Sequence, residues 1–70
     1  MKGEFVAVKF VPVQTSSSET VSNEWQQFDR WEYRGYLKSF LRAIINENSG
    51  SGNKVVISTS SGDFLKEFIF

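Results

Sequence analysis

The sequence contains no cysteine and no histidine, and it has a single proline among its 70 residues. The missing cysteines exclude disulfide bonds, and the two absences together exclude zinc sites built from cysteine and histidine. They also remove the commonest general base and the thiol nucleophile of enzymes. No apolar run approaches the roughly 18 residues of a membrane-spanning helix. We therefore expect a protein that is not an enzyme, has no cofactor and no metal, and does not bind a membrane.

Neither sign of charge is in excess, because eight Lys and Arg residues balance eight Asp and Glu residues. General attraction to nucleic acid or to an anionic membrane is therefore not indicated, and any such binding would need a local patch. Residues 1–6 lack the apolar core and cleavage site of a signal peptide. We expect a soluble, cytoplasmic protein.

A chain of 70 residues is long enough for one domain only, and it buries roughly 60% of its unfolded surface. Domains of this size usually need a disulfide, a metal or a partner subunit for stability. With the first two excluded, a strongly aromatic core or self-association remains. The seven Phe, two Trp and two Tyr residues can supply such a core.

The clearest periodic pattern lies at residues 36–47, where apolar residues recur at helical spacing. They are Tyr36, Leu37, Phe40, Leu41, Ile44 and Ile45. The Asn, Ser and Gly residues of 48–53 tolerate positive φ angles and indicate where this helix ends. The sequence therefore predicts a helix with one buried face.

Strands are predicted at residues 4–13, 54–60 and 64–70, which are rich in β-branched and aromatic types. Gly62 suits a tight turn between the last two, so they should form a C-terminal hairpin. Residues 14–23 are polar and predict a surface loop, with a phosphorylated regulatory loop as the alternative.

The predicted strands are apolar on both faces. The first strand alternates between two mostly apolar sets, and the last strand should place Phe64, Phe68 and Phe70 on one face and Leu65 and Ile69 on the other. One helix covers only one face of a sheet. The other face must therefore be covered by residues 24–34 or by another copy of the chain, and a homodimer is our expectation.

Residues 24–34 allow three interpretations. Asn23 would be a good N-cap, so one helix with two apolar faces can run over 24–47. A second interpretation breaks this helix at Gly35, where the apolar phase changes. In the third, residues 28–34 form a strand that alternates through aromatic side chains. The sequence leaves the three open.

Basic residues recur at intervals of four through this region, as Arg30, Arg34, Lys38 and Arg42. On a continuous helix they form one row, with Trp31 beside it. Such a row suits an acidic protein partner, or phosphate contacts combined with base stacking. The plainer interpretation is a solvated helix face, and a strand at 28–34 would break the row.

Asp29 and Glu32 would also share a helix face, and a carboxylate pair can hold a metal or perform acid–base chemistry. Because Arg30 and Arg34 lie beside them, a solvated, charge-neutralised face is the better interpretation. The pair therefore does not change the expectation that the protein is not an enzyme.

The patterns together predict one α+β domain over residues 1–70, in the order β-α-β-β. One main helix over about 24–47, or one broken near Gly35, packs on a three-stranded sheet that ends in a C-terminal hairpin. The expected function is a small regulatory binding protein that acts through a protein–protein interface. Its predicted partner-binding residues are Arg30, Trp31, Arg34, Lys38 and Arg42. Nucleic-acid binding through the same residues is the alternative. In size alone, the chain resembles the short accessory and inhibitor proteins of phages and mobile elements.

Overall fold

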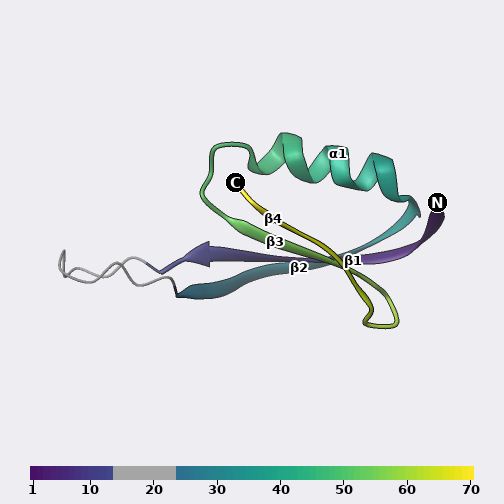
Figure 1. Ribbon diagram of the computed structural model, residues 1–70, viewed down its shortest axis with the longest axis horizontal. Coiled ribbons are helices and arrows are strands. Elements are labelled where there is room, and N and C mark those ends of the chain that lie inside the picture. The colour runs from purple at the N-terminus through teal and green to yellow at the C-terminus, as the bar shows by residue number, and fades with distance from the viewer. Residues whose placement is uncertain (14–23) are drawn as a thin grey trace.

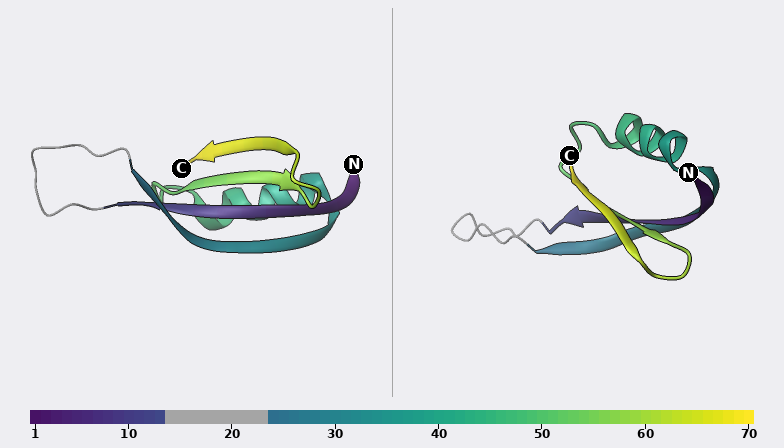
Figure 2. Two further views of the ribbon diagram at one scale, coloured as in Figure 1. Left: turned by 90° about the horizontal axis from the view of Figure 1, so that it is seen from below. Right: turned by 45° about the vertical axis from the view of Figure 1, so that its right-hand side comes forward.

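The computed structural model describes residues 1–13 and 24–70, which form an antiparallel sheet with one helix on one of its faces (Figures 1 and 2). The elements in chain order are β1 (Lys2–Pro12), β2 (Trp25–Tyr36), α1 (Leu37–Asn48), β3 (Lys54–Thr59) and β4 (Phe64–Ile69). The sheet has four strands rather than the three predicted, because β2 joins it, and the strand order is β2-β1-β3-β4. The predicted α+β class is confirmed, although the order is β-β-α-β-β rather than β-α-β-β.

The main difference from the sequence analysis lies in β2, which is a strand throughout. Of the three interpretations of residues 24–34, the strand is the one that forms, and a helix over 24–47, whole or broken at Gly35, is wrong in its first half. β2 pairs with β1 along its whole length, and a β-bulge at Phe28 interrupts the register. The extra residue reverses the alternation of side chains, so Trp25 and Trp31 lie on opposite faces of the sheet.

β2 continues directly into α1 without a loop. Gly35 makes this possible because its φ is 149°, a backbone conformation that residues with a Cβ rarely adopt. The Tyr33 side chain lies against this glycine, so that a Cβ there would be 2.8 Å from the Tyr33 hydroxyl. The Leu37 N–H donates to the Met1 carbonyl at 2.9 Å, which satisfies one free donor of the first helical turn.

The core lies between α1 and the sheet, with Phe40 at its centre. The Phe40 ring stacks on Tyr33 with ring centroids 4.6 Å apart and meets Trp31 edge to face at 6.2 Å. Aromatic contacts of this kind add to the stability gained by burial. The buried cluster comprises Phe5, Ala7, Phe40, Ile44, Val55 and Ile57.

α1 ends at Asn48, within one residue of the predicted end of the helix. The Asn48 side chain is buried, and its Nδ2 donates to the Ile44 carbonyl at 2.9 Å. Gly50 and Gly52 follow with φ angles of 77° and 80°, so the positive φ angles predicted for this segment are confirmed. The predicted polar loop at 14–23, its phosphorylation alternative and the predicted N-cap at Asn23 lie outside the described residues.

β3 and β4 form the predicted C-terminal hairpin, which turns at Gly62 with a φ of 97°. A second bulge, at Leu65, shifts the register of this pair. Phe68 pairs with the buried Val55, whereas Phe64 pairs with Ser58 on the other face. The predicted common face of Phe64 and Phe68 is therefore wrong, because a bulge changes which residues alternate.

Candidate binding surface

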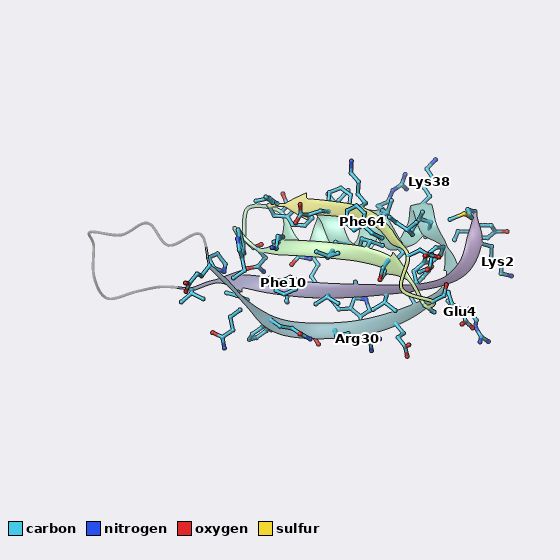
Figure 3. The ribbon with its side chains drawn as sticks, turned by 60° about the horizontal axis from the view of Figure 1, so that its bottom comes forward. Lys2, Glu4, Phe10, Arg30, Lys38 and Phe64 are labelled. Carbon is cyan, nitrogen blue, oxygen red and sulfur yellow. The ribbon has the colours of Figure 1, made fainter. Side chains whose placement is uncertain are left out.

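The face of the sheet opposite α1 is uncovered in the described part of the chain, and Figure 3 views the sheet from this side, with α1 behind it. The alternation along β1 defines this face, because Phe5 and Ala7 contact the core and the even-numbered residues point away. We call it the open face. Strand pairing assigns to it Lys2, Glu4, Val6, Val8, Phe10, Pro12, Trp25, Gln27, Arg30, Glu32, Arg34, Tyr36, Lys54, Val56, Ser58, Phe64, Glu67 and Ile69.

Apolar side chains cross the open face from strand to strand. Val6 is buried at its centre, while Val8, Phe10 and Val56 are only half-buried. On the outermost strand β4, Phe64 and Ile69 remain 65% and 69% exposed. Exposed apolar side chains that gather on one face typically mark an interaction site.

Lys54 lies within this apolar surface rather than projecting from it. Its Nζ atom is 5.0 Å from the centroid of the Phe10 ring and 5.3 Å from that of Trp25. The same atom is 3.9 Å from Oε1 of Glu67. The ammonium group is therefore engaged by two aromatic faces and one carboxylate, which keeps it close to the sheet.

A second charge pair lies toward the other end of the face, where Nε of Arg34 donates to Oε1 of Glu4 at 3.0 Å. Both side chains are largely exposed, so this pair adds little stability. Within residues 1–13 and 24–70, the Arg30 guanidinium makes no ion pair. The open face as a whole carries an excess of one positive charge, from Lys2, Arg30, Arg34 and Lys54 against Glu4, Glu32 and Glu67.

One row of paired residues crosses all four strands of the open face, in the order Arg30, Val8, Val56, Glu67. We call it the central row. It has a cation at the β2 edge, two apolar residues in the middle and an anion at the β4 edge. Its two halves are therefore opposite in charge.

The basic row predicted from the sequence does not form, because β2 is a strand. Arg30 and Arg34 lie on the open face, whereas Lys38 and Arg42 lie on exposed positions of α1, on the other side of the sheet (Figure 3). Trp31 is packed against Phe40 in the core. The structure thus divides the predicted residues between the open face, the exposed side of α1 and the core, and their role in partner binding stays a prediction.

Lys38 and Arg42 remain neighbours on α1, one helical turn apart on its exposed side. Asp29 and Glu32 do not share a face, because Asp29 pairs with Lys9 and Glu32 pairs with Val6. In the described ranges, no group of three acidic residues is placed to hold a metal ion. Nor does the part of the chain that the structure describes include a helix with the length and apolar character needed to cross a membrane.

Sequence reasoning missed the apolar and charged residues that make up the open face, chiefly Phe10, Trp25, Lys54, Val56 and Glu67. The alternating apolar residues of β1 did indicate that a second face needs a cover, but β2 had first to be placed in the sheet. No protein-family model, curated protein or solved structure matches the chain. The function is therefore inferred from the open face.

Proposed function

We propose that this protein is a non-catalytic, regulatory binding protein that acts through a protein–protein interface on the open face. The supporting observation is the exposure of Phe64 and Ile69 on the same face as the half-buried Val8, Phe10 and Val56. A partner that covers these side chains removes apolar surface from water, which is the main driving force of protein association. The predicted cytoplasmic location stays a prediction.

The position of β2 supports this proposal. The sequence allowed two covers for the second face, residues 24–34 or another copy of the chain. Residues 25–36 are themselves part of the sheet, so they extend the open face instead of covering it. Because residues 24–34 do not cover this face, a separate polypeptide is left to do so. It is either a second copy of the chain or a different partner protein.

Binding of single-stranded nucleic acid is the second candidate, and the aromatic rings of Phe10 and Trp25 beside Lys54 favour it. Bases stack on such rings, and cations contact the phosphates. However, Lys54 and Arg34 are already paired with Glu67 and Glu4. The near balance of charge on the open face gives a phosphate backbone little net attraction. A protein surface fits these features better.

The test compares two apolar-to-lysine variants at exposed positions. We expect Ile69→Lys, on the open face, to lose partners that the wild-type protein captures, because an ammonium group would have to be desolvated in the interface. Ile45→Lys, on α1, is the matched control and should keep them. Pull-down followed by mass spectrometry measures both. Equal capture by Ile69→Lys and the wild type would contradict the proposal.

A salt titration with single-stranded DNA and RNA oligonucleotides tests the second candidate. Binding that weakens steeply with salt, and that Arg30→Glu abolishes, would favour nucleic acid over a protein partner. We expect no such binding at low salt.

A further inference from the structure

We propose that the occupant of the open face is a second copy of this chain, packed face to face about a two-fold axis that runs along the strands between β1 and β3. This inference rests on the proposed function, because it names the partner of the same surface. It is drawn from the charge pattern of the central row, which is complementary to itself when reversed.

The axis determines which strands meet. A two-fold rotation about a line between β1 and β3 places β2 over the partner's β4, and β1 over the partner's β3. In the central row, Arg30 then faces the partner's Glu67 at one edge, and symmetry repeats this contact at the other. Val8 faces the partner's Val56 between them. Two sheets that pack in this way form an aligned β-sandwich.

The charges select this axis over the other two-fold arrangement. An axis across the strands, along the central row, would place Arg30 over the partner's Arg30 and Glu67 over the partner's Glu67. Like charges at close range oppose association and disfavour that arrangement. Only the axis along the strands brings opposite charges together in both halves of the row.

The state of Arg30 and Glu67 in the single chain agrees with this arrangement. The Arg30 guanidinium lacks an ion pair among the described residues and is exposed. The Glu67 side chain is 46% exposed, and its contact with Lys54 involves only Oε1, at 3.9 Å. The second carboxylate oxygen remains able to accept from the partner's Arg30, whose planar group has five donors.

The next row adds a contact of the same kind. It pairs Phe10 of β1 with Lys54 of β3, so the same axis places Phe10 over the partner's Lys54. The Lys54 ammonium already lies 5.0 Å from the Phe10 ring of its own chain. The partner's ring would cover it from the other side, and the symmetric contact doubles the effect.

The decisive experiment reverses the two charges of the central row, singly and together, and measures association by sedimentation equilibrium from about 10 µM to about 1 mM, the range of a small interface. We expect the wild type to dimerise, and we expect Arg30→Glu and Glu67→Arg each to dimerise about tenfold more weakly or worse, because each creates two like-charge contacts. Lys38→Glu on α1 is the matched control and should dimerise as the wild type does.

Restoration of dimerisation by pairing the two reversed charges is the most specific outcome. An equimolar mixture of Arg30→Glu and Glu67→Arg should form a heterodimer, because the side chain at position 30 of each chain is then opposite in charge to the side chain at position 67 of the other. The double variant should dimerise with itself for the same reason. Circular dichroism of each single variant checks that it is folded. If a single variant does not fold, the double variant alone still tests the pairing.

A wild type that stays monomeric throughout this range would overturn the inference. Dimers that are insensitive to the reversals, or that neither the mixture nor the double variant restores, would also overturn it. The proposed function has a separate test. It is contradicted if Ile69→Lys keeps every captured partner. It survives a monomeric wild type if Ile69→Lys loses a captured protein other than a second copy of this chain.

Discussion

Gly35 is the residue on which the direct passage from β2 into α1 depends. Its φ of 149° and the close approach of the Tyr33 ring both require the absence of a Cβ. The residue opposite it in the sheet is also a glycine, Gly3, which has no positive φ and only an ordinary 3.5 Å contact with Phe5 for an added Cβ. The two glycines therefore offer a matched comparison.

We expect Gly35→Ala to lower the free energy of unfolding by about 1 to 3 kcal/mol, because it combines backbone strain with a steric clash. Gly3→Ala should change it by less than about 1 kcal/mol, and can raise it by restricting the unfolded chain. Urea denaturation followed by tryptophan fluorescence measures both variants. Equal losses would show that the φ of Gly35 is not what constrains this position.

Asn48 is the one buried polar side chain among the described residues, at 2% exposure. Its Nδ2 donates to the Ile44 carbonyl at 2.9 Å, and its Oδ1 accepts from Nδ2 of Asn53 at 3.4 Å. An aspartate at this position would lose the donor and place a carboxylate at the negative end of the α1 dipole. Burial would raise the pKa of that carboxyl above its value in the unfolded chain.

Asn48→Asp should therefore lose about 1 to 3 kcal/mol of stability at pH 7 relative to the exposed control Asn46→Asp. A carboxyl group whose pKa is raised by folding destabilises the folded state least below its unfolded pKa of about 4. The difference in stability between the two variants should therefore narrow as the pH falls toward that value. Thermal unfolding at several pH values measures this gap. A gap that is constant with pH would refute the burial of the new carboxyl.

At the scale of elements, α1 is held to the sheet chiefly through Phe40, which contacts Phe5, Trp31 and Tyr33. We expect Phe40→Ala to lower the free energy of unfolding by about 3 to 5 kcal/mol, which is most of the stability of a domain this small. Ile45→Ala, on the exposed side of the same helix, should cost less than about 1 kcal/mol. Circular dichroism melting curves compare the two.

If Phe40→Ala melted at the same temperature as Ile45→Ala, the packing of α1 would contribute little to the stability of the fold. Fluorescence supplies a second measurement, because Trp31 lies edge to face with Phe40 at 6.2 Å. Its emission should shift to longer wavelength in Phe40→Ala as water reaches the indole ring. Trp25, on the open face, should change much less.

The helix could be predicted from the sequence and β2 could not, for reasons that concern particular residues. Of the six apolar residues at helical spacing, Leu37, Phe40, Leu41 and Ile44 pack against the sheet as predicted, whereas Tyr36 and Ile45 are exposed. In β2, the bulge at Phe28 interrupts the period of two, so Trp25 and Trp31 lie on opposite faces, whereas in a regular strand two residues six apart share a face. The possible N-cap at Asn23 then favoured a helix.

The failure to recognise β2 as a strand also limited the prediction of the binding surface. Arg30, Glu32 and Arg34 alternate with Trp31 and Tyr33, which is a strand pattern with a charged open face and an aromatic core face. The pattern covers too few residues to exclude a helix by itself. The need for a cover on the second face was predictable from β1, but the residues of that face depended on strand pairing, which sequence periodicity does not supply.

At the scale of the molecule, the sheet has two different edges. The β2 edge carries several charges and a bulge, features that discourage pairing with another strand, whereas β4 exposes Phe64 and Ile69. Face-to-face packing along the strands would bring these β4 residues against the partner's β2. The proposed dimer therefore shields the more apolar edge with the more charged one.

Dimerisation would also link stability to concentration, since a partner that binds only the folded chain stabilises it by mass action. We expect the melting temperature of the wild type to rise with protein concentration between about 10 µM and about 1 mM, and that of Arg30→Glu to stay nearly constant. Mixing Arg30→Glu with Glu67→Arg should restore the rise. Lys38→Glu serves as the control and should behave as the wild type does. Differential scanning calorimetry measures all four, and a melting temperature of the wild type that does not depend on concentration would show that the open face does not contribute to stability through self-association.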